Sequence, residues 1–167
     1  MQENKNKLSI CLWFDGRVGE AAKFYTGIFN DSNFSSKILN QSEFPDEAPG
    51  DRHTGDELVY EIEINGMKVQ LLNGGPMFKQ SEAFSFVVNC EDQTEVDFYW
   101  EKLLEGGKES QCGWLKDKFG VSWQIIPKQL GKLMSGADKA KNKRVFDAMM
   151  KMKKIIVADL EKASEDR

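Results

Sequence analysis

The order strand, helix, strand pair occurs twice along this chain, and that repetition limits the fold more than any other feature of the sequence. In the first copy the predicted strand, helix and hairpin strands lie at residues 8–14, 17–29, 58–64 and 67–72. Asn65-Gly66 joins the last two strands, and this dipeptide favours a tight β-hairpin. The intervening residues 34–44 are polar and only weakly strand-like. The first copy therefore predicts a small unit with both a helix and a sheet.

The second copy repeats this pattern, with predicted elements at residues 83–90, 92–104, 112–118 and 121–127. Asp92 followed by Glu95 has the spacing of a helix N-terminal cap. An offset of 74 residues aligns apolar strand positions and two aromatic pairs, namely Ile10, Leu12 and Phe14 with Phe84, Phe86 and Val88, and Phe24-Tyr25 with Phe98-Tyr99. We infer an internal duplication and an α+β fold of tandem βαβββ units.

Charge and hydropathy exclude several classes of protein. The 167 residues have a formal net charge of -4, which argues against a nucleic-acid binder of the basic type. No apolar run approaches the roughly 20 residues of a membrane span, and the start of the chain is polar, so we expect a cytoplasmic protein without membrane partners. Three scattered cysteines, Cys11, Cys90 and Cys112, are expected to be reduced, half-buried thiols.

Residues 128–167 have no strand signal and are expected to form a helical extension. Val145, Phe146, Met149 and Met150 follow helical spacing and predict a packed stripe. Residues 138–154 carry seven Lys or Arg against two Asp. We interpret this basic stretch as a solvated face rather than a membrane or nucleic-acid surface; a scaffold or regulator that uses the tail is an alternative.

Four phrases, CLWFDG, LNGGPMF, CEDQTEVDFYW and CGWLKDKFGVSWQIIP, resemble the PhnB-like branch of the vicinal oxygen chelate (glyoxalase, bleomycin resistance, dioxygenase) superfamily. The resemblance covers residues 8–127, and the MMKMKK tail is also similar to that branch. It implies a domain at 1–127 with units at about 8–75 and 81–127, followed by an extension at 128–167. It further implies a cupped mixed sheet, a ligand pocket in its concave face and a homodimer.

Catalytic members of this superfamily hold a divalent metal with His and Glu ligands, and this chain departs from that pattern. The resemblance places Gln124 where members often have the ligand Glu, and Ser85 is the only polar side chain on the strand that often carries a His. The nearest equivalents on other strands include Cys11 and Gln70. Amides, hydroxyls and one thiol are poor ligands for such a site, so we expect no standard metal centre and no cofactor, with a weak divalent site as the alternative.

The candidate pocket residues are those at the family's ligand positions or beside them: Cys11, Trp13, Gln70, Ser85, Trp123 and Gln124. Indole walls suit a flat or apolar ligand, so Trp13 and Trp123 are expected to face the pocket, whereas Trp100 is expected in the core.

Three further features each have two interpretations. The only histidine, His53, lies in an acidic, Pro/Gly-containing stretch and is either an acid or base on a flap or a solvated loop residue. Residues 72–76 either present backbone amides to a ligand or link the two units. Lys116 and Asp117 either orient an anion or a proton, or form an exposed pair beside a turn.

The function that the sequence favours is small-molecule binding in a cup of aromatic and polar side chains. A metal-dependent lyase, isomerase or dioxygenase of the same fold is the alternative. Members of the branch often carry the name 3-demethylubiquinone-9 3-methyltransferase, but the first strand ends at Asp15-Gly16 and lacks the glycine-rich turn expected of a doubly wound methyltransferase sheet. A methyltransferase is therefore the least favoured alternative.

Overall fold

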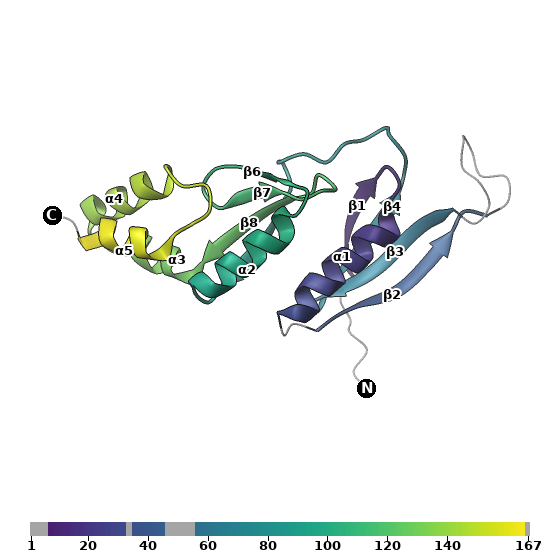
Figure 1. Cartoon of the computed structure of the whole chain (residues 1–167), viewed down its shortest axis with the longest axis horizontal. Helices are drawn as coiled ribbons and strands as arrows, with labels where there is room; N and C mark the ends of the chain where they lie inside the picture. Colours follow the sequence, from purple (N-terminus) through teal and green to yellow (C-terminus); the bar gives the residue numbers. More distant parts are fainter. Residues whose placement is uncertain (1–6, 33–34, 46–55, 166–167) are drawn as a thin grey trace. The chain divides into compact units, whose positions relative to one another are not determined.

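The computed structural model describes residues 7–32, 35–45 and 56–165. The chain divides into two compact units, Met1–Gln80 and Ser81–Arg167, called unit 1 and unit 2. Figure 1 shows the helices and strands of each unit. His53 lies outside the described residues, so its proposed role as a flap acid or base stays a prediction.

Within its described residues, unit 1 contains one helix and a four-stranded mixed sheet (Figure 1). Its elements are β1 (Ile10–Phe14), α1 (Val18–Asp31), β2 (Ser36–Glu43), β3 (Glu57–Ile64) and β4 (Met67–Asn73). The strand order is β1-β4-β3-β2, with β1 parallel to β4 and the other neighbours antiparallel. The predicted strand, helix and hairpin are confirmed, and the weak segment at 34–44 supplies the edge strand β2.

Alternation along the strands gives this sheet one apolar face, which packs against α1. On β3, for example, Tyr60, Ile62 and Ile64 are buried, and α1 buries Val18 and Tyr25. The other face, called the open face of unit 1, carries half-buried or exposed side chains: Cys11, Trp13, Val59, Glu61, Glu63, Lys68, Gln70 and Leu72.

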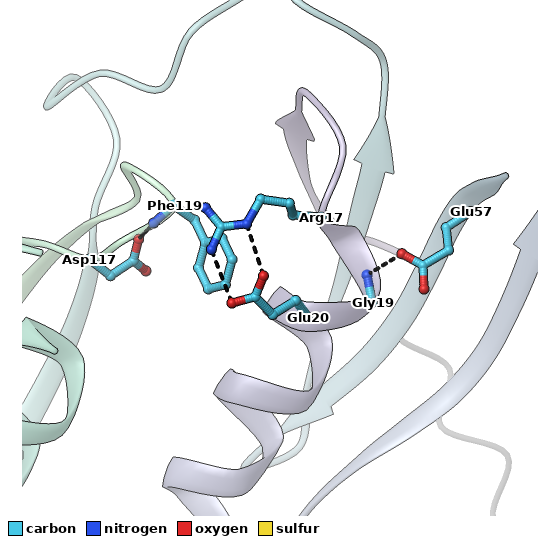
Figure 2. Close-up of polar contacts among 6 residues, drawn as sticks. All are labelled: Arg17, Gly19, Glu20, Glu57, Asp117 and Phe119. Atoms are coloured by element: carbon cyan, nitrogen blue, oxygen red, sulfur yellow. Dashed lines mark hydrogen bonds and ion pairs between the residues drawn. The ribbon is translucent and has the colours of Figure 1, made fainter. Parts of the chain in front are cut away.

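The first turn of α1 is held by Glu57, the first residue of β3. Its carboxylate accepts hydrogen bonds from the Gly19 amide and the Tyr60 hydroxyl, each at 3.0 Å, and Figure 2 shows the contact with Gly19. A Cβ on Gly19 would lie 2.1 Å from Glu57 Oε1, so a larger residue here would displace the carboxylate. Because the N-terminal end of a helix carries partial positive charge, the carboxylate stabilises it and ties α1 to the sheet.

Unit 2 repeats the architecture of unit 1 (Figure 1). Its first elements are β5 (Phe86–Cys90), α2 (Gln93–Leu104), β6 (Lys108–Glu109), β7 (Trp114–Lys116) and β8 (Ser122–Pro127). The strand order is β5-β8-β7-β6, with β5 parallel to β8. Counted within each unit, this is the same order as in unit 1: first, fourth, third, second strand. The tandem βαβββ fold is confirmed. The strand predicted at 83–90 begins only at Phe86, and the two residues of β6 were too few to give an alternating pattern.

The aromatic pairs aligned by the repeat have matching roles in the two helices. Tyr25 in α1 and Tyr99 in α2 are each 1% exposed. Each meets its preceding phenylalanine edge-on, with ring centroids 5.6 Å apart for Phe24 and Tyr25 and 5.2 Å apart for Phe98 and Tyr99. The sequence correspondence therefore reflects equivalent packing against the two sheets.

One face of the unit 2 sheet packs against α2 and carries Phe86, Val88, Cys90, Leu115, Trp123 and Ile125, all buried. The other, called the open face of unit 2, carries the alternate side chains: Val87, Asn89, Trp114, Lys116, Ser122, Gln124 and Ile126, with Ser85 just before β5. Trp100 on α2 is 5% exposed and lies in the core, as predicted.

The C-terminal extension is helical and is part of unit 2. It comprises α3 (Lys128–Met134), α4 (Lys139–Met149) and α5 (Val157–Glu165). Leu130, Val145, Ile155 and Leu160 form its own buried cluster. The amides of Cys112 and Gly113 donate to the carbonyls of Met152 and Lys153 at 2.8 and 2.7 Å, which fastens the extension to the segment before β7.

The predicted apolar stripe of α4 packs only in part. Val145 is fully buried and Met149 packs against the helical cluster, whereas Phe146 and Met150 are 43% and 50% exposed. The stripe was therefore predicted too wide. Residues four apart share a helix face, and the step from Val145 to Phe146 turns about 100° away from the cluster.

The thiols differ from the expectation of three half-buried groups. Cys11 is exposed, Cys112 is intermediate and Cys90 is buried, and all three are free. Among the described residues, no helix combines the length and hydropathy that a membrane span requires.

Candidate functional site

The three candidates in unit 1 lie together on its open face. Cys11 and Trp13 are two residues apart on β1 and therefore share a face of the sheet. Gln70 on β4 is the register partner of Cys11. The Gln70 side chain donates to Glu61 Oε1 at 3.2 Å, so its amide is already engaged across the β3–β4 pair. Burial raises the pKa of the Cys11 thiol. The thiolate is therefore a minor form at neutral pH, which argues against an activated nucleophile.

Trp13 is covered by residues 74–80, called the strap. Its indole N–H donates to the Gly75 carbonyl at 2.7 Å, and its ring meets Phe78 edge-on at 4.9 Å. The Gln80 amide donates to the Trp13 carbonyl at 2.6 Å. A Cβ on Gly74 would lie 2.2 Å from the Trp13 ring, so this close contact requires glycine. The glycines at 72–76 thus pack against Trp13 in this structure.

The two candidates on the open face of unit 2 are hydrogen-bonded to each other. Gln124 Nε2 donates to Ser85 Oγ at 2.9 Å. The register of β8 places Gln124 between Val87 on β5 and Trp114 on β7. The open face of unit 2 therefore combines an amide, a hydroxyl and an indole in neighbouring strands.

The expectation that Trp123 faces the same pocket is wrong. Trp123 and Gln124 are adjacent on β8 and therefore point to opposite faces of the sheet. Trp123 is 1% exposed, its ring lies 4.8 Å from that of Phe86, and its indole N–H donates to Asp117 Oδ2 at 2.9 Å. It is a core residue on the α2 side.

Asp117 is likewise a structural residue rather than half of an exposed pair, since it is only 4% exposed. Its Oδ1 accepts from the amides of Phe119 at 2.9 Å and Val121 at 3.0 Å, which closes the β7–β8 turn. Figure 2 shows the bond from Phe119. Lys116 remains at the surface and forms an ion pair with Glu82 at 2.7 Å.

A pocket of about 210 Å³ lies on the open face of unit 2. Its lining includes Glu82, Lys108, Glu109, Trp114, Lys116 and Ser122. Trp114, Lys108 and Ser122 were not among the pocket residues predicted from the sequence. The sequence did hold information about two of them. Trp114 is two residues from Lys116 on one predicted strand, and Ser122 is two residues from Gln124 on another, so each pair shares a face. Lys108 could not be placed because β6 itself was not predicted.

The residues that the resemblance assigns to metal positions are poor ligands for a divalent cation. The described part of the chain contains no group of three or more His, Cys, Asp or Glu side chains suited to a metal. At the equivalent positions in unit 2, the Gln124 amide and the Ser85 hydroxyl use each other as partners. Neutral amide and hydroxyl groups lack the charge and basicity of carboxylate and imidazole ligands.

Comparison with solved structures identifies related folds. The putative 3-demethylubiquinone-9 3-methyltransferase, PhnB protein, from Bacillus cereus is 29% identical with a TM-score of 0.63, over 72% of this chain and 98% of that one. The fosfomycin resistance protein FosX from Listeria monocytogenes is 14% identical with a TM-score of 0.54, over 80% of this chain and 100% of that one. The latter similarity is one of fold alone.

Among curated proteins, tRNA (guanine-N(7)-)-methyltransferases from Chlamydia trachomatis and Chlamydia muridarum are 27% and 26% identical over 105 residues. The match covers 63% of this chain and 43% of theirs, so the chain spans less than half the length of these relatives.

A family model described as 3-demethylubiquinone-9 3-methyltransferase matches residues 6–126. This match covers most of the chain and agrees with the tandem βαβββ units and with the PhnB structure from Bacillus cereus. The chain therefore belongs to the 3-demethylubiquinone-9 3-methyltransferase family, the PhnB-like branch of the vicinal oxygen chelate superfamily.

Proposed function

We propose that this protein binds a small molecule in the pocket on the open face of unit 2. The observation that carries the proposal is the pocket itself, where an indole and several polar side chains line about 210 Å³. Small-molecule sites combine apolar walls with a few polar groups that fix orientation. This volume lies below the roughly 300–1,000 Å³ of drug-sized sites, so it suits a ligand of one or two rings.

Gln124 and Ser85 extend the polar part of the open face beyond the pocket, because Gln124 is the register partner of Trp114. Cys11, Trp13 and Gln70 form a second candidate surface on unit 1. The strap already covers Trp13 and occupies its indole N–H, which favours unit 2 as the binding unit.

Matched tryptophan variants test where binding occurs. A fragment library screened by intrinsic fluorescence should give ligands whose signal is lost in Trp114→Phe and kept in Trp13→Phe. Both side chains are half-buried, so neither change should unfold the chain. Signals lost only in Trp13→Phe would place the site on unit 1, and signals retained in both variants would refute the proposal.

A metal-dependent enzyme is the alternative that the superfamily suggests, and the side chains at the metal positions argue against it. Native mass spectrometry before and after chelator treatment tests this alternative. Stoichiometric metal that the chelator removes would favour the enzyme, whereas ligand binding that survives chelator favours the binding protein. The same spectrum reports the subunit number and thus tests the expected homodimer.

The family description and the curated relatives name methyltransferases, so a methyl-transfer role needs its own test. Each sheet of this chain has four strands in the order of a βαβββ unit, which differs from the doubly wound parallel sheet of dinucleotide-type folds. We expect no heat of binding when S-adenosylmethionine is titrated into the protein in a calorimeter. Micromolar binding would revive the methyltransferase alternative.

A further inference from the structure

Two lysines face each other in the pocket of unit 2. Lys108 on β6 and Lys116 on β7 are register partners, so both side chains project from the same face of the strand pair. Like charges directly opposite each other destabilise a strand pair. Glu82 neutralises Lys116 at 2.7 Å, whereas Lys108 has no ion pair with any residue that the structure describes. Of the two facing ammonium groups, the described residues therefore neutralise only that of Lys116.

The acidic residues of the pocket are already paired. Glu82 binds Lys116, and Glu109 binds Lys153 from the C-terminal extension. The pocket and its pairing partners therefore contain three ammonium groups against two carboxylates, which leaves an excess of one positive charge beside Lys108. A ligand with a single negative charge would balance this excess.

Ser122 adds an independent indication of a missing partner. It lines the pocket as the register partner of Lys116, and it is 2% exposed. Its Oγ is buried and has no hydrogen-bond partner among the residues that the structure describes. Buried hydroxyl groups are normally hydrogen-bonded, because leaving one unpaired costs free energy. Because the hydroxyl is fully buried, a ligand oxygen can accept its hydrogen bond only once the side chains that cover it have moved aside.

Trp114 supplies the apolar part of the pocket. It lies two residues before Lys116 on β7, so the indole and the ammonium group belong to the same face. Its side chain is half-buried. An aromatic ring stacked on this indole would bury apolar surface and would bring an acidic substituent near the lysines and Ser122.

We propose that this pocket selects small aromatic carboxylates: the ring packs on Trp114, the carboxylate lies between Lys108 and Lys116, and Ser122 donates a hydrogen bond to it. This inference rests on the proposed function and adds the chemical class of the ligand. Glu82 holds Lys116 in the free protein, and its side chain is 67% exposed, so it can yield that ammonium group to a bound carboxylate.

The test compares 2-naphthoate with its neutral analogue 2-naphthamide, each titrated into the full-length ¹⁵N-labelled protein and followed by NMR. Naphthoate should shift amide signals of β6, β7 and β8 and bind about tenfold more tightly than naphthamide, as charge-assisted hydrogen bonds imply. Lys108→Met should abolish this preference. Lys139→Met, which removes an exposed lysine from α4, is the matched control and should leave the preference unchanged.

Ser122→Ala gives a second readout that a purely structural serine would not give. Removing an unpaired buried hydroxyl should raise the midpoint of urea unfolding while weakening naphthoate binding about threefold or more. A lower midpoint with unchanged binding would overturn the role of Ser122 and with it this inference.

The outcomes separate the inference from the function on which it rests. Equal affinity for naphthoate and naphthamide at the pocket would overturn the carboxylate preference and leave small-molecule binding intact. If library fragments bind the open face but neither naphthyl compound does, the carboxylate preference is likewise overturned and small-molecule binding stands. A library without any ligand for the open face would refute both.

Discussion

Replacing Trp123 should destabilise the fold while leaving the pocket intact, which is the opposite of what its position beside Gln124 first implied. Trp123 is 1% exposed, packs on Phe86 and donates its indole N–H to Asp117 Oδ2 at 2.9 Å. Trp123→Phe removes that donor, so Asp117 Oδ2 loses the indole hydrogen bond. The Asp117 side chain is only 4% exposed. The change therefore affects both packing and a buried carboxylate.

Two contributions set the size of the effect. A hydrogen bond to a charged group contributes about 1.5–3 kcal/mol, and the smaller ring leaves a cavity that costs about 1 kcal/mol more. We therefore expect Trp123→Phe to lower the free energy of unfolding by about 3 kcal/mol, a large part of the roughly 5–15 kcal/mol typical of a domain. Trp114→Phe at the half-buried pocket position should cost less than about 1 kcal/mol.

Urea unfolding followed by circular dichroism measures these differences. Asp117→Asn supplies the partner change, because its amide would present an N–H or a weaker acceptor to the indole. The double variant should cost less than the sum of the single variants, since both remove the same bond. A loss below about 1 kcal/mol for Trp123→Phe, or an equal loss for Trp114→Phe, would refute this account.

Three other changes test separate contacts. Gly74→Ala places a methyl group 2.2 Å from the Trp13 ring, so it should displace the strap and red-shift or quench Trp13 emission, whereas Gly131→Ala, with open space around it, should not. Hydrogen bonding to Lys154 lowers the pKa of Asp97 below its ordinary 3.8. The ion pair therefore stabilises the extension above that pH and is lost as the pH falls through the lowered value. A titration of the Ile155 methyl signals down to pH 2 should show this loss, and Asp97→Asn should remove it. Burial raises the pKa of Cys90 to about 12, so at pH 8 about one thiol in 10⁴ is ionised; iodoacetamide should spare it in the folded protein, and labelling as fast as that of exposed Cys11 would contradict this.

Most of the fold could be predicted because its core obeys simple periodicities. The Asn65-Gly66 hairpin connects β3 and β4, and the aligned pairs Phe24-Tyr25 and Phe98-Tyr99 pack equivalently in α1 and α2. The hairpin is specified by two exposed turn residues, whereas the helices are specified by aromatic side chains that pack against the sheets. The predicted ends of the elements were less accurate where few side chains are buried, as at β6 and at the start of β5.

The candidate site was harder to predict, because its residues follow no periodicity of their own. Trp123 was assigned to the pocket as a neighbour of Gln124, although adjacent strand residues point to opposite faces. Lys108 depends on a two-residue strand, and the unpaired state of Ser122 depends on what surrounds it in three dimensions. Residue type could suggest an aromatic and polar pocket, but the face on which each side chain lies had to come from the register.

The two units share a strand order yet differ in what their open faces leave available. In unit 1 the strap takes up the Trp13 indole, and Glu61 takes up the Gln70 amide. In unit 2 the Trp114 indole lines a pocket. Among the described residues, Lys108 has no ion pair and the Ser122 hydroxyl has no hydrogen-bond partner. Because a repeated fold constrains mainly its core, the open faces were free to diverge, and Lys108 and Ser122 both lie on the open face of unit 2. Ligand binding should therefore depend on Trp114 and Lys108 rather than on the equivalent face of unit 1.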